Sequence, residues 1–457
     1  MQRIPIFMQR FTRLAGAVAL AGLAVGCSDL SDSLLEATDP DLINPGDTRS
    51  PEGAIAVYNG ALNRFQAISA GEISSWLFGG LLADEWSTSS TFVQNDETDQ
   101  RAIKLNNSVV TDIFSDLSQV RTAANQAIAL LEEFQPAMTA QRAEMYLARG
   151  FAEMQLASDF CNGIPLSDGS GAVPVLGTQQ TVAEVFQVAI ASLDEAIALA
   201  SGTSSLDVSV RTAARIIKAR AQLGLGDIAA AGATVNGINT DFAYRHTFAI
   251  TSDDNTIWGQ GISSERFNVG DNHEGNQGQY LVANAINFAS ADDPRLPIIF
   301  TGSNGQDGQT HMRNTTLYDR ETPVDVANGI DARLIEAEAA LAAGQPAQMM
   351  TILNELRANP PQLGDIQPAA MAPLADPGTQ EARVDLLFRE KAFWTFSRGQ
   401  RLGDMRRLIR DYGRTPANTF PVGQHFKGGD YGSDLNLPVG DDELNNPNFS
   451  GCTDRNA

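Results

Sequence analysis

The sequence of 457 residues predicts an all-α protein, in which tight helix hairpins form a scaffold around a loop-rich insert. Apolar residues recur at helical spacing over much of the chain, which predicts amphipathic helices. Short turns that contain glycine divide several of these helices into pairs, which predicts hairpins. Residues 238–328 lose this periodicity and are rich in Asn, Gly, Asp, Ser and aromatic residues, so they form the predicted insert.

Four helices are expected in the N-terminal part. Pro51 opens the first of them, because proline is favoured in the first turn of a helix. Thr181 and Glu184 form a capping-box pattern before the fourth, since each side chain can bond the backbone N–H of the other residue. The expected ranges are Glu52–Ala67, Leu117–Phe134, Ala140–Asp159 and the apolar stripe from Val182 to Ile197.

Two helix hairpins further along the chain resemble each other. Both have an Ala-rich first helix and a tight turn, at Gly226-Asp227 in one and at Gly344 in the other. Their small residues and short turns resemble tetratricopeptide helix hairpins. The expected helices are Ala213–Leu225 with Ile228–Val235, and Ile330–Ala343 with Ala347–Ala358.

Two irregular segments, residues 70–107 and 238–328, form the candidate ligand surface. Long irregular segments inside a compact domain are commonly functional loops. Both carry aromatic residues, among them Trp86 and Trp258. The alternative is that these aromatic residues only pin the loops to the helical body.

The N-terminal segment has the pattern of a bacterial lipoprotein export signal. Arginines at positions 3, 10 and 13 precede an apolar run from Leu14 to Val25, and small residues lead into Cys27. The run is too short to span a bilayer, so it is expected to be removed with the signal. We therefore expect a diacylglycerol anchor on Cys27. An ordinary signal peptide cleaved near Gly26 is the alternative.

These features divide the chain into a signal peptide, a lipidated acidic tether and a helical domain. The tether carries six carboxylates and no Lys or Arg between Ser28 and Thr48, which is typical of a solvated linker. The net charge of −23 argues against nucleic acid as a partner and limits membrane contact to the lipid anchor. The expected boundaries are 1–26, 27–50 and 51–457, with the helical domain divided into 51–237, 238–328 and 329–457.

The two remaining cysteines, Cys161 and Cys452, are expected to form a disulfide bond, because an exported protein meets an oxidising compartment. Such a bond would tie the C-terminal tail to the helical body. Two free thiols are the alternative.

Motifs for catalysis and cofactor binding are missing from the sequence. It contains no phosphate-binding glycine loop, CxxC, HExxH or GxSxG pattern. We therefore predict no catalytic residue, no cofactor and no metal ligand. Asn/Asp/Gly-rich stretches such as Asp271–Asn276 leave a calcium site open, although ordinary turns explain them as well.

One long motif resembles the late signature of the SusD/RagB family. Residues 386–408 are LLFREKAFWTFSRGQRLGDMRRL, in which a helix with Glu390 ends near Gly399 and an Arg-x-x-Asp-hydrophobic-Arg helix follows. Four further motifs occur in the family's order, so the resemblance covers essentially all of the mature chain. They are the helix and Gly-Ile-Pro-Leu turn of 148–166, Asp293-Pro294-Arg295, the LIEAEA segment of 334–339 and the LNLPV segment of 435–439.

This resemblance implies a surface-exposed lipoprotein of the outer membrane that captures oligomeric nutrients without catalysis. Its partners would be an oligosaccharide or oligopeptide ligand and a TonB-dependent outer-membrane transporter that receives the ligand. It also implies a tetratricopeptide-like scaffold with a loop-rich binding face. Glycan binding needs flat aromatic faces and a few fixed polar groups, so Trp86, Trp258 and Arg101 are the candidate ligand residues.

Two other functions stay open. A helical glycoside hydrolase or lyase would need two carboxylates facing each other in a cleft, and Asp84 with Glu85, or Asp96 with Asp99, are the available pairs. A tetratricopeptide-like scaffold for envelope assembly is the other function. In the long motif, Glu390, Arg401 and Asp404 are interpreted as ion-pairing residues rather than as a catalytic cluster.

Overall fold

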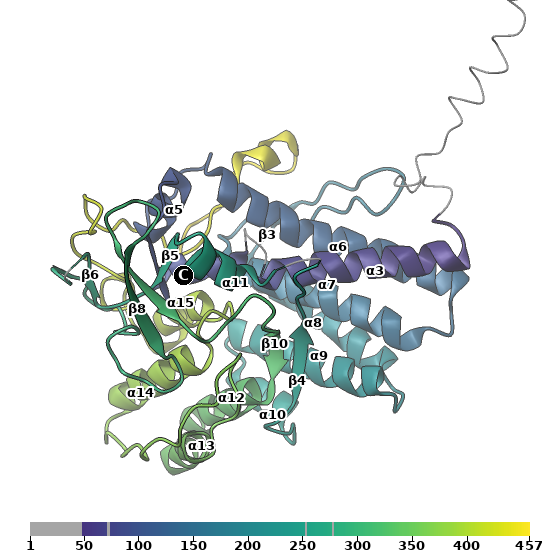
Figure 1. The fold of residues 1–457 in the computed structure, drawn as a ribbon. Coiled ribbons are helices and arrows are strands. Elements are labelled where there is room, and N and C mark those ends of the chain that lie inside the picture. The colour runs from purple at the N-terminus through teal and green to yellow at the C-terminus, as the bar shows by residue number, and fades with distance from the viewer. Residues whose placement is uncertain (1–47, 71–73, 252–253, 277) are drawn as a thin grey trace, which may run out of the picture. The chain divides into compact units, whose positions relative to one another are not determined.

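Long helices make up most of the computed structural model, which describes residues 48–70, 74–251, 254–276 and 278–457 (Figure 1). Residues Ser50–Ala457 form one compact unit. The predicted all-α class is confirmed, since the strands are few and short. The predicted export signal, Cys27 and nearly all of the tether lie outside the described residues.

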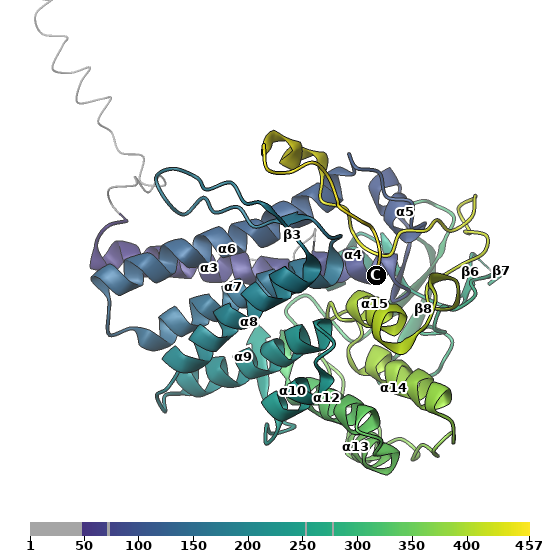
Figure 2. The same ribbon diagram turned by 180° about the vertical axis from the view of Figure 1, so that it is seen from behind.

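Helices that follow one another in the chain pack side by side in a continuous stack (Figures 1 and 2). This arrangement confirms the predicted helix hairpins, because each helix buries its apolar stripe against its neighbours. The stack comprises α3 (Pro51–Ala70), α6 (Ser108–Phe134), α7 (Thr139–Asp159), α8 (Val182–Leu199), α9 (Ser205–Gly224), α10 (Ile228–Val235), α12 (Gly329–Ala342) and α13 (Pro346–Ala358).

Capping side chains fix where these helices begin. The capping box of Thr181 and Glu184 is present at the start of α8, as predicted. Helix α6 begins nine residues before the predicted Leu117, because the Asn107 side chain accepts the N–H of Val110. Helix α9 likewise begins at Ser205 because Ser204 caps it. Caps of this kind extend a helix beyond its periodic apolar residues.

The prediction that residues 70–107 are irregular is wrong. The segment contains α4 (Ser75–Leu82), β1 (Trp86–Thr88) and α5 (Val93–Asp99). Every residue of α4 is buried, so this helix has no polar face and no amphipathic pattern. Periodicity cannot detect a helix that is surrounded by protein on all sides.

The insert, also expected to be irregular, is held together by short antiparallel strand pairs. Strands β4 (Ala243–His246) and β10 (Val324–Asn328) pair its two ends. Strand β1 pairs with β5 (Phe267–Val269), which joins the insert to the segment 70–107. Two more pairs lie within the insert: β6 (His273–Glu274) with β7 (Tyr280–Leu281), and β8 (Ile298–Asn304) with β9 (His311–Thr315). Outside the insert, β2 (Ile164–Pro165) pairs with β3 (Gln179–Gln180) between α7 and α8.

The long motif forms α14 (Gln380–Trp394), a turn and α15 (Arg401–Tyr412). Gly399 adopts a φ of +64° in this turn, and a Cβ there would lie 2.1 Å from the indole of Trp76. Only glycine fits both the backbone conformation and the close approach. The turn therefore rests against the buried core.

The charged residues of the motif form buried ion pairs with distant parts of the chain. Arg401 donates to both carboxylate oxygens of Asp84, at 2.7 and 2.8 Å. Glu390 accepts from Arg295 at 2.8 Å and from Arg357 at 2.9 Å. These contacts agree with the ion-pairing interpretation of Glu390 and Arg401, because buried charges are stable only when paired.

Glu338 on α12 is the centre of a second buried network. It accepts from Lys391 of α14 at 3.0 Å, from Arg407 of α15, and from the hydroxyl of Tyr412 at 2.6 Å. Burial alone would raise the pKa of Glu338, but Arg407 and Lys391 hold that pKa well below its usual range. Asp404 completes the network by pairing with Lys391 at 2.7 Å.

Glu85 is a buried carboxyl group that forms no ion pair with any cation of the described residues. Its Oε1 accepts the N–H of Ser397 at 3.0 Å, and its Oε2 is buried without a hydrogen-bond partner. Burial raises the pKa of Glu85 from 4.5 to about 8, with nearby Asp84 adding to the effect. The group is therefore mostly protonated at neutral pH.

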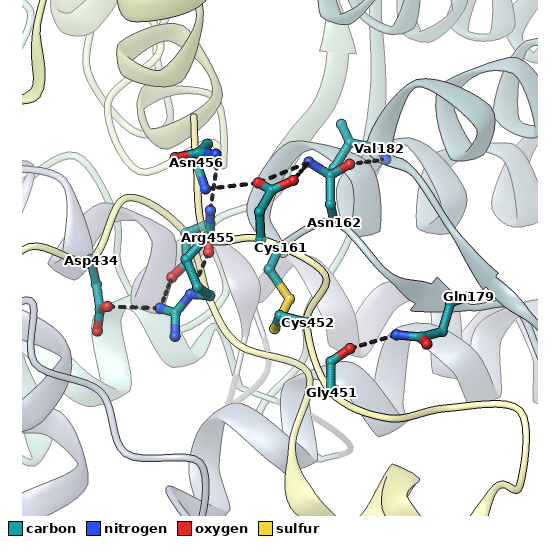
Figure 3. The surroundings of a disulfide bond; sticks show 11 residues. Cys161, Asn162, Gln179, Val182, Asp434, Gly451, Cys452, Arg455 and Asn456 are labelled. Carbon is teal, nitrogen blue, oxygen red and sulfur yellow. Dashed lines mark hydrogen bonds and ion pairs between the residues drawn. A yellow bond between two sulfur atoms is a disulfide. The ribbon is translucent and has the colours of Figure 1, made fainter.

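The C-terminal tail is attached to the end of α7 (Figure 3). Cys161 and Cys452 are disulfide-bonded in the structure, with Cα atoms 5.9 Å apart. Beside the bond, Asn162 donates to the Asp454 carboxylate, and its own side-chain oxygen accepts the N–H of Val182. The tail thus lies next to the first turn of α8.

Replacing Glu85 by Gln should remove a pH-dependent loss of stability. Between pH 4.5 and about 8 the folded protein keeps a proton on Glu85 that the unfolded chain releases, so stability falls as the pH rises. The advantage of Glu85→Gln should grow by up to roughly 1.4 kcal/mol per pH unit in this window and then level off. Urea unfolding at a series of pH values measures this, and parallel curves for both proteins would contradict it.

Loss of the Cys161–Cys452 bond should lower the free energy of unfolding. The bond closes a loop with a sequence separation of 291, so Cys452→Ser should cost up to roughly 5 kcal/mol in the loop-entropy model. Reduction of the parent protein should have the same effect as the substitution. The direct measurement is thiol counting on denatured, unreduced lipoprotein, in which two reactive thiols would refute the pairing.

Candidate functional site

The strand pairs bring the two candidate ligand segments together on one side of the helical stack. Figure 1 shows α5, β5, β8 and α11 (Thr256–Trp258) gathered there. Strand β5 contacts β1, β9 and the π-helical turn η1 (Gly259–Ser263) that continues α11. We call this surface, formed by α5, α11, η1 and the β8–β9 hairpin, the insert face.

Trp258 lies on the insert face with its side chain partly exposed. The Asn255 side chain caps α11 by accepting the N–H of Ile257 at 3.0 Å, and it donates to the carbonyl of Thr322 at 2.8 Å. The Arg320 guanidinium lies 6.0 Å from the Trp258 ring centre. The indole is therefore held in a fixed position beside a cation, and π-helical turns such as η1 often occur at functional sites.

A small pocket of about 10 Å³ adjoins Trp258. Such a volume holds at most one water, so this pocket is a shallow hollow and not a closed binding chamber. The polar side chains of Asn314 and Thr315 on β9 line it together with Tyr318. A flat indole beside polar groups suits one face of a sugar ring.

Two aromatic residues of the same face were not singled out from the sequence. Phe92, before α5, is 44% exposed and lies under the Arg266 guanidinium, 4.0 Å from its ring centre. Phe300 on β8 is 69% exposed. Nothing in their local sequence separates them from the buried aromatic residues, because exposure depends on the strand pairing.

The prediction that Trp86 stacks on a ligand does not fit the structure. Its side chain is buried, its indole N–H donates to the Ser397 hydroxyl at 3.2 Å, and Phe396 packs against its ring. The residue lines the floor of the pocket below Trp258. Trp86 is therefore part of the hydrophobic core, and neither face of its ring is free to stack on a sugar.

The prediction that Arg101 contacts a ligand does not fit the structure either. Arg101 is 2% exposed and donates to the backbone carbonyls of Asp434 at 2.9 Å and Pro421 at 2.6 Å. Its guanidinium lies 4.8 Å from the ring centre of Phe420, and burial lowers its pKa to about 10. Its hydrogen bonds hold the C-terminal segment, so it cannot reach a ligand at the surface.

The carboxylate pairs that a hydrolase would need are engaged in other contacts. Asp84 pairs with Arg401, and Glu85 is buried next to it. Asp99 accepts the N–H of Thr88 at 2.8 Å and lies 3.2 Å from His425. Asp96 pairs with Lys427 at 2.8 Å. All four carboxyl groups are therefore engaged in contacts within the fold.

A larger cavity of about 690 Å³ lies away from the insert face, between the β4–β10 pair and the helices α12 and α13. Its lining is mostly polar and includes Arg245, Asp325, Arg333 and the partly buried ring of Phe242. Its volume is in the range of small-molecule sites. It is the competing location for a ligand.

Within the described residues, no group of three or more His, Cys, Asp or Glu side chains is arranged to hold a metal ion. None of the helices in the described residues is both long enough and apolar enough to cross a membrane. The stretch 271–276, considered for calcium, contains strand β6, and Asp271 accepts the N–H of His273 at 3.0 Å.

Comparison with solved structures shows which known proteins share this fold. No family model matches the sequence, and no curated protein matches it either. A SusD superfamily protein from Bacteroides fragilis is 16% identical with a TM-score of 0.63, over 88% of this chain and 99% of the other. A SusD-like carbohydrate-binding protein from Bacteroides vulgatus is 13% identical with a TM-score of 0.60, over 88% and 97% of the two chains. The protein therefore has the fold of the SusD superfamily.

Proposed function

We propose that the protein is a SusD-type lipoprotein that binds an oligomeric nutrient, most simply a glycan, at the insert face. The observation that carries this proposal is the position of Trp258, partly exposed and fixed by the cap of α11. Phe92 and Phe300 add further exposed aromatic area on the same face. An open face of this kind suits a chain of sugar rings better than one small molecule.

Similarity of fold supports the same ligand class. Among the structural neighbours, one is a SusD-like carbohydrate-binding protein and another is a putative sugar-binding protein, both from Bacteroides vulgatus. The Arg320 side chain, 41% exposed beside Trp258, provides hydrogen-bond donors for sugar hydroxyls. A peptide ligand would use the same groups, and a ligand screen separates the two classes.

Binding without catalysis is part of the proposal. The carboxylate pairs suggested by the sequence are committed to ion pairs or buried, so they do not face each other across a cleft. The proposed protein therefore holds its ligand unchanged.

Delivery of the ligand to a TonB-dependent outer-membrane transporter completes the proposal. It rests on the motif resemblance and on the predicted anchor at Cys27. Purification of the lipoprotein under mild detergent should bring a transporter barrel with it. A protein that purifies with envelope assembly factors and no transporter would instead be a tetratricopeptide-like scaffold.

Trp258→Ala should weaken glycan binding about tenfold, since stacking on an aromatic ring contributes about 1 kcal/mol or somewhat more. Affinity electrophoresis against a panel of polysaccharides, followed by calorimetry with the best oligosaccharide, measures the change. Val173→Ala, an exposed apolar position in the loop between α7 and α8, is the matched control and should bind as the parent does.

Two outcomes would contradict this assignment. Binding that survives Trp258→Ala but is lost in Phe242→Ala would place the ligand in the larger cavity instead. Turnover of a polymer that persists through repurification and disappears on substitution of one carboxylate would identify a hydrolase.

Cys27→Ser should abolish lipid attachment of the mature protein. The parent is expected to take up labelled palmitate and to fractionate with membranes, because two or more acyl chains give stable attachment. The variant should stay unprocessed or become soluble. A parent protein that is soluble, unacylated and begins at another residue would refute the lipoprotein assignment.

A further inference from the structure

A cavity lined by basic residues, the basic cavity, lies where α7, α9, α12 and α14 meet α15. Figure 2 labels these helices in one view. The internal volume of the basic cavity is about 40 Å³. One water needs roughly 10–15 Å³, so the space holds about three waters or one small ion and excludes a sugar ring. Five cationic side chains line it: Arg220, Lys391, Arg406, Arg407 and Arg410.

Three of these cations have carboxylate partners. Lys391 and Arg407 both pair with Glu338, and Arg410 pairs with Asp411 at 3.1 Å. Asp404 also pairs with Lys391 at 2.7 Å and with Arg407 at 3.3 Å, so three carboxylates balance the three cations and these groups need no further ligand.

Among the described residues, Arg406 and Arg220 have no such partner. Arg406 is 2% exposed and its Nη1 donates to the carbonyls of Ala157 and Ser158, while its Nε and Nη2 are buried without a hydrogen-bond partner. Arg220 is 9% exposed, reaches only the carbonyl of Gly399 at 3.4 Å, and its Nη1 has no partner. Two buried guanidinium groups therefore adjoin one cavity without a carboxylate in contact.

Two nearby carboxyl groups, Asp331 and Asp159, do not fully compensate for these charges. Asp331 lines the cavity and attracts Arg220, but both of its carboxylate oxygens already accept from Arg398, at 2.9 and 2.8 Å. Asp159 is buried, and burial raises its pKa to about 7, so it carries only part of a negative charge at neutral pH. Its side chain accepts instead from Gln155 at 2.7 Å. Burial also lowers the pKa values of Arg220 and Arg406 to about 10, so both remain charged at neutral pH.

The start of α15 adds a second attraction for an anion. Gln400 and Gly403, from the N-terminal end of this 12-residue helix, line the cavity. No side chain caps this end, so its free N–H groups and the positive end of the helix dipole are available. Helix N-termini of this kind bind phosphate and sulfate.

We propose that the basic cavity binds one small tetrahedral oxyanion, inorganic phosphate or sulfate, as a structural ligand of the junction between α15, α7 and α9. The anion would supply the negative charge that Arg220 and Arg406 lack. It enters beside Arg410, whose side chain is exposed at the edge of the cavity. The site is separate from the insert face and does not depend on the proposed nutrient.

Thermal unfolding at constant ionic strength, with phosphate or sulfate replacing chloride, tests this proposal. The parent should show a saturable rise in Tm with either oxyanion, since a ligand that binds only the folded state stabilises it. Arg220→Met, which removes the charge and one long hydrogen bond, should weaken this binding at least tenfold. Arg383→Met removes a surface cation paired with Asp376 and should leave the oxyanion affinity unchanged.

A second variant narrows the cavity without removing a charge. A Cβ at Gly403 would lie 3.7 Å from Ser158, an ordinary contact, so Gly403→Ala should fold normally and still weaken oxyanion binding. Crystals of the parent soaked in selenate should show anomalous density between Arg220 and Arg406. Density only at surface sites, no saturable rise in Tm, or equal rises in the parent and both cavity variants would overturn the proposal.

Discussion

The pairing of buried charges is the constraint on which the rest of this structure depends. Asp84, Glu338 and Glu390 each accept from an Arg or Lys that is distant in sequence, so no two of the segments involved can shift without exposing an unpaired charge. Breaking one such pair typically costs about 3–5 kcal/mol. The pairs thereby hold α14 and α15 against the helical stack and against the insert.

The same constraint positions the ligand surface. Arg401 fixes the end of α4, and β1 follows directly and pairs with β5 of the insert. Arg295 ties the insert to Glu390 of α14. Trp86 fills the space beneath, where it contacts Phe396. With its base fixed, the insert can carry exposed aromatic residues such as Trp258 in a defined position, as an open binding face requires.

A few buried ionisable groups have no ion-pair partner among the described residues, and each needs another explanation. Glu85 avoids the cost of burial by keeping its proton. Arg220 and Arg406 cannot do so, because a guanidinium stays protonated at neutral pH. Unpaired buried cations beside a cavity therefore indicate a ligand site in this protein. Clusters of acidic side chains do not, because the chain has 55 Asp and Glu residues and such clusters arise by chance.

The sequence by itself determined the helical scaffold and indicated three of its ion-pairing residues, Glu390, Arg401 and Asp404. Periodic apolar stripes and the cap of Thr181 are local features, so α8, α10, α12 and α13 were predictable within a few residues. The solvent exposure of a side chain, in contrast, is not determined by the local sequence. Only the tertiary structure decided that Trp86 and Arg101 are buried while Phe92 and Phe300 face solvent. Trp86 lies in the β1–β5 pair, and the C-terminal segment covers Arg101. The fully buried α4 was missed for the same reason, since its environment comes entirely from residues far away in the chain.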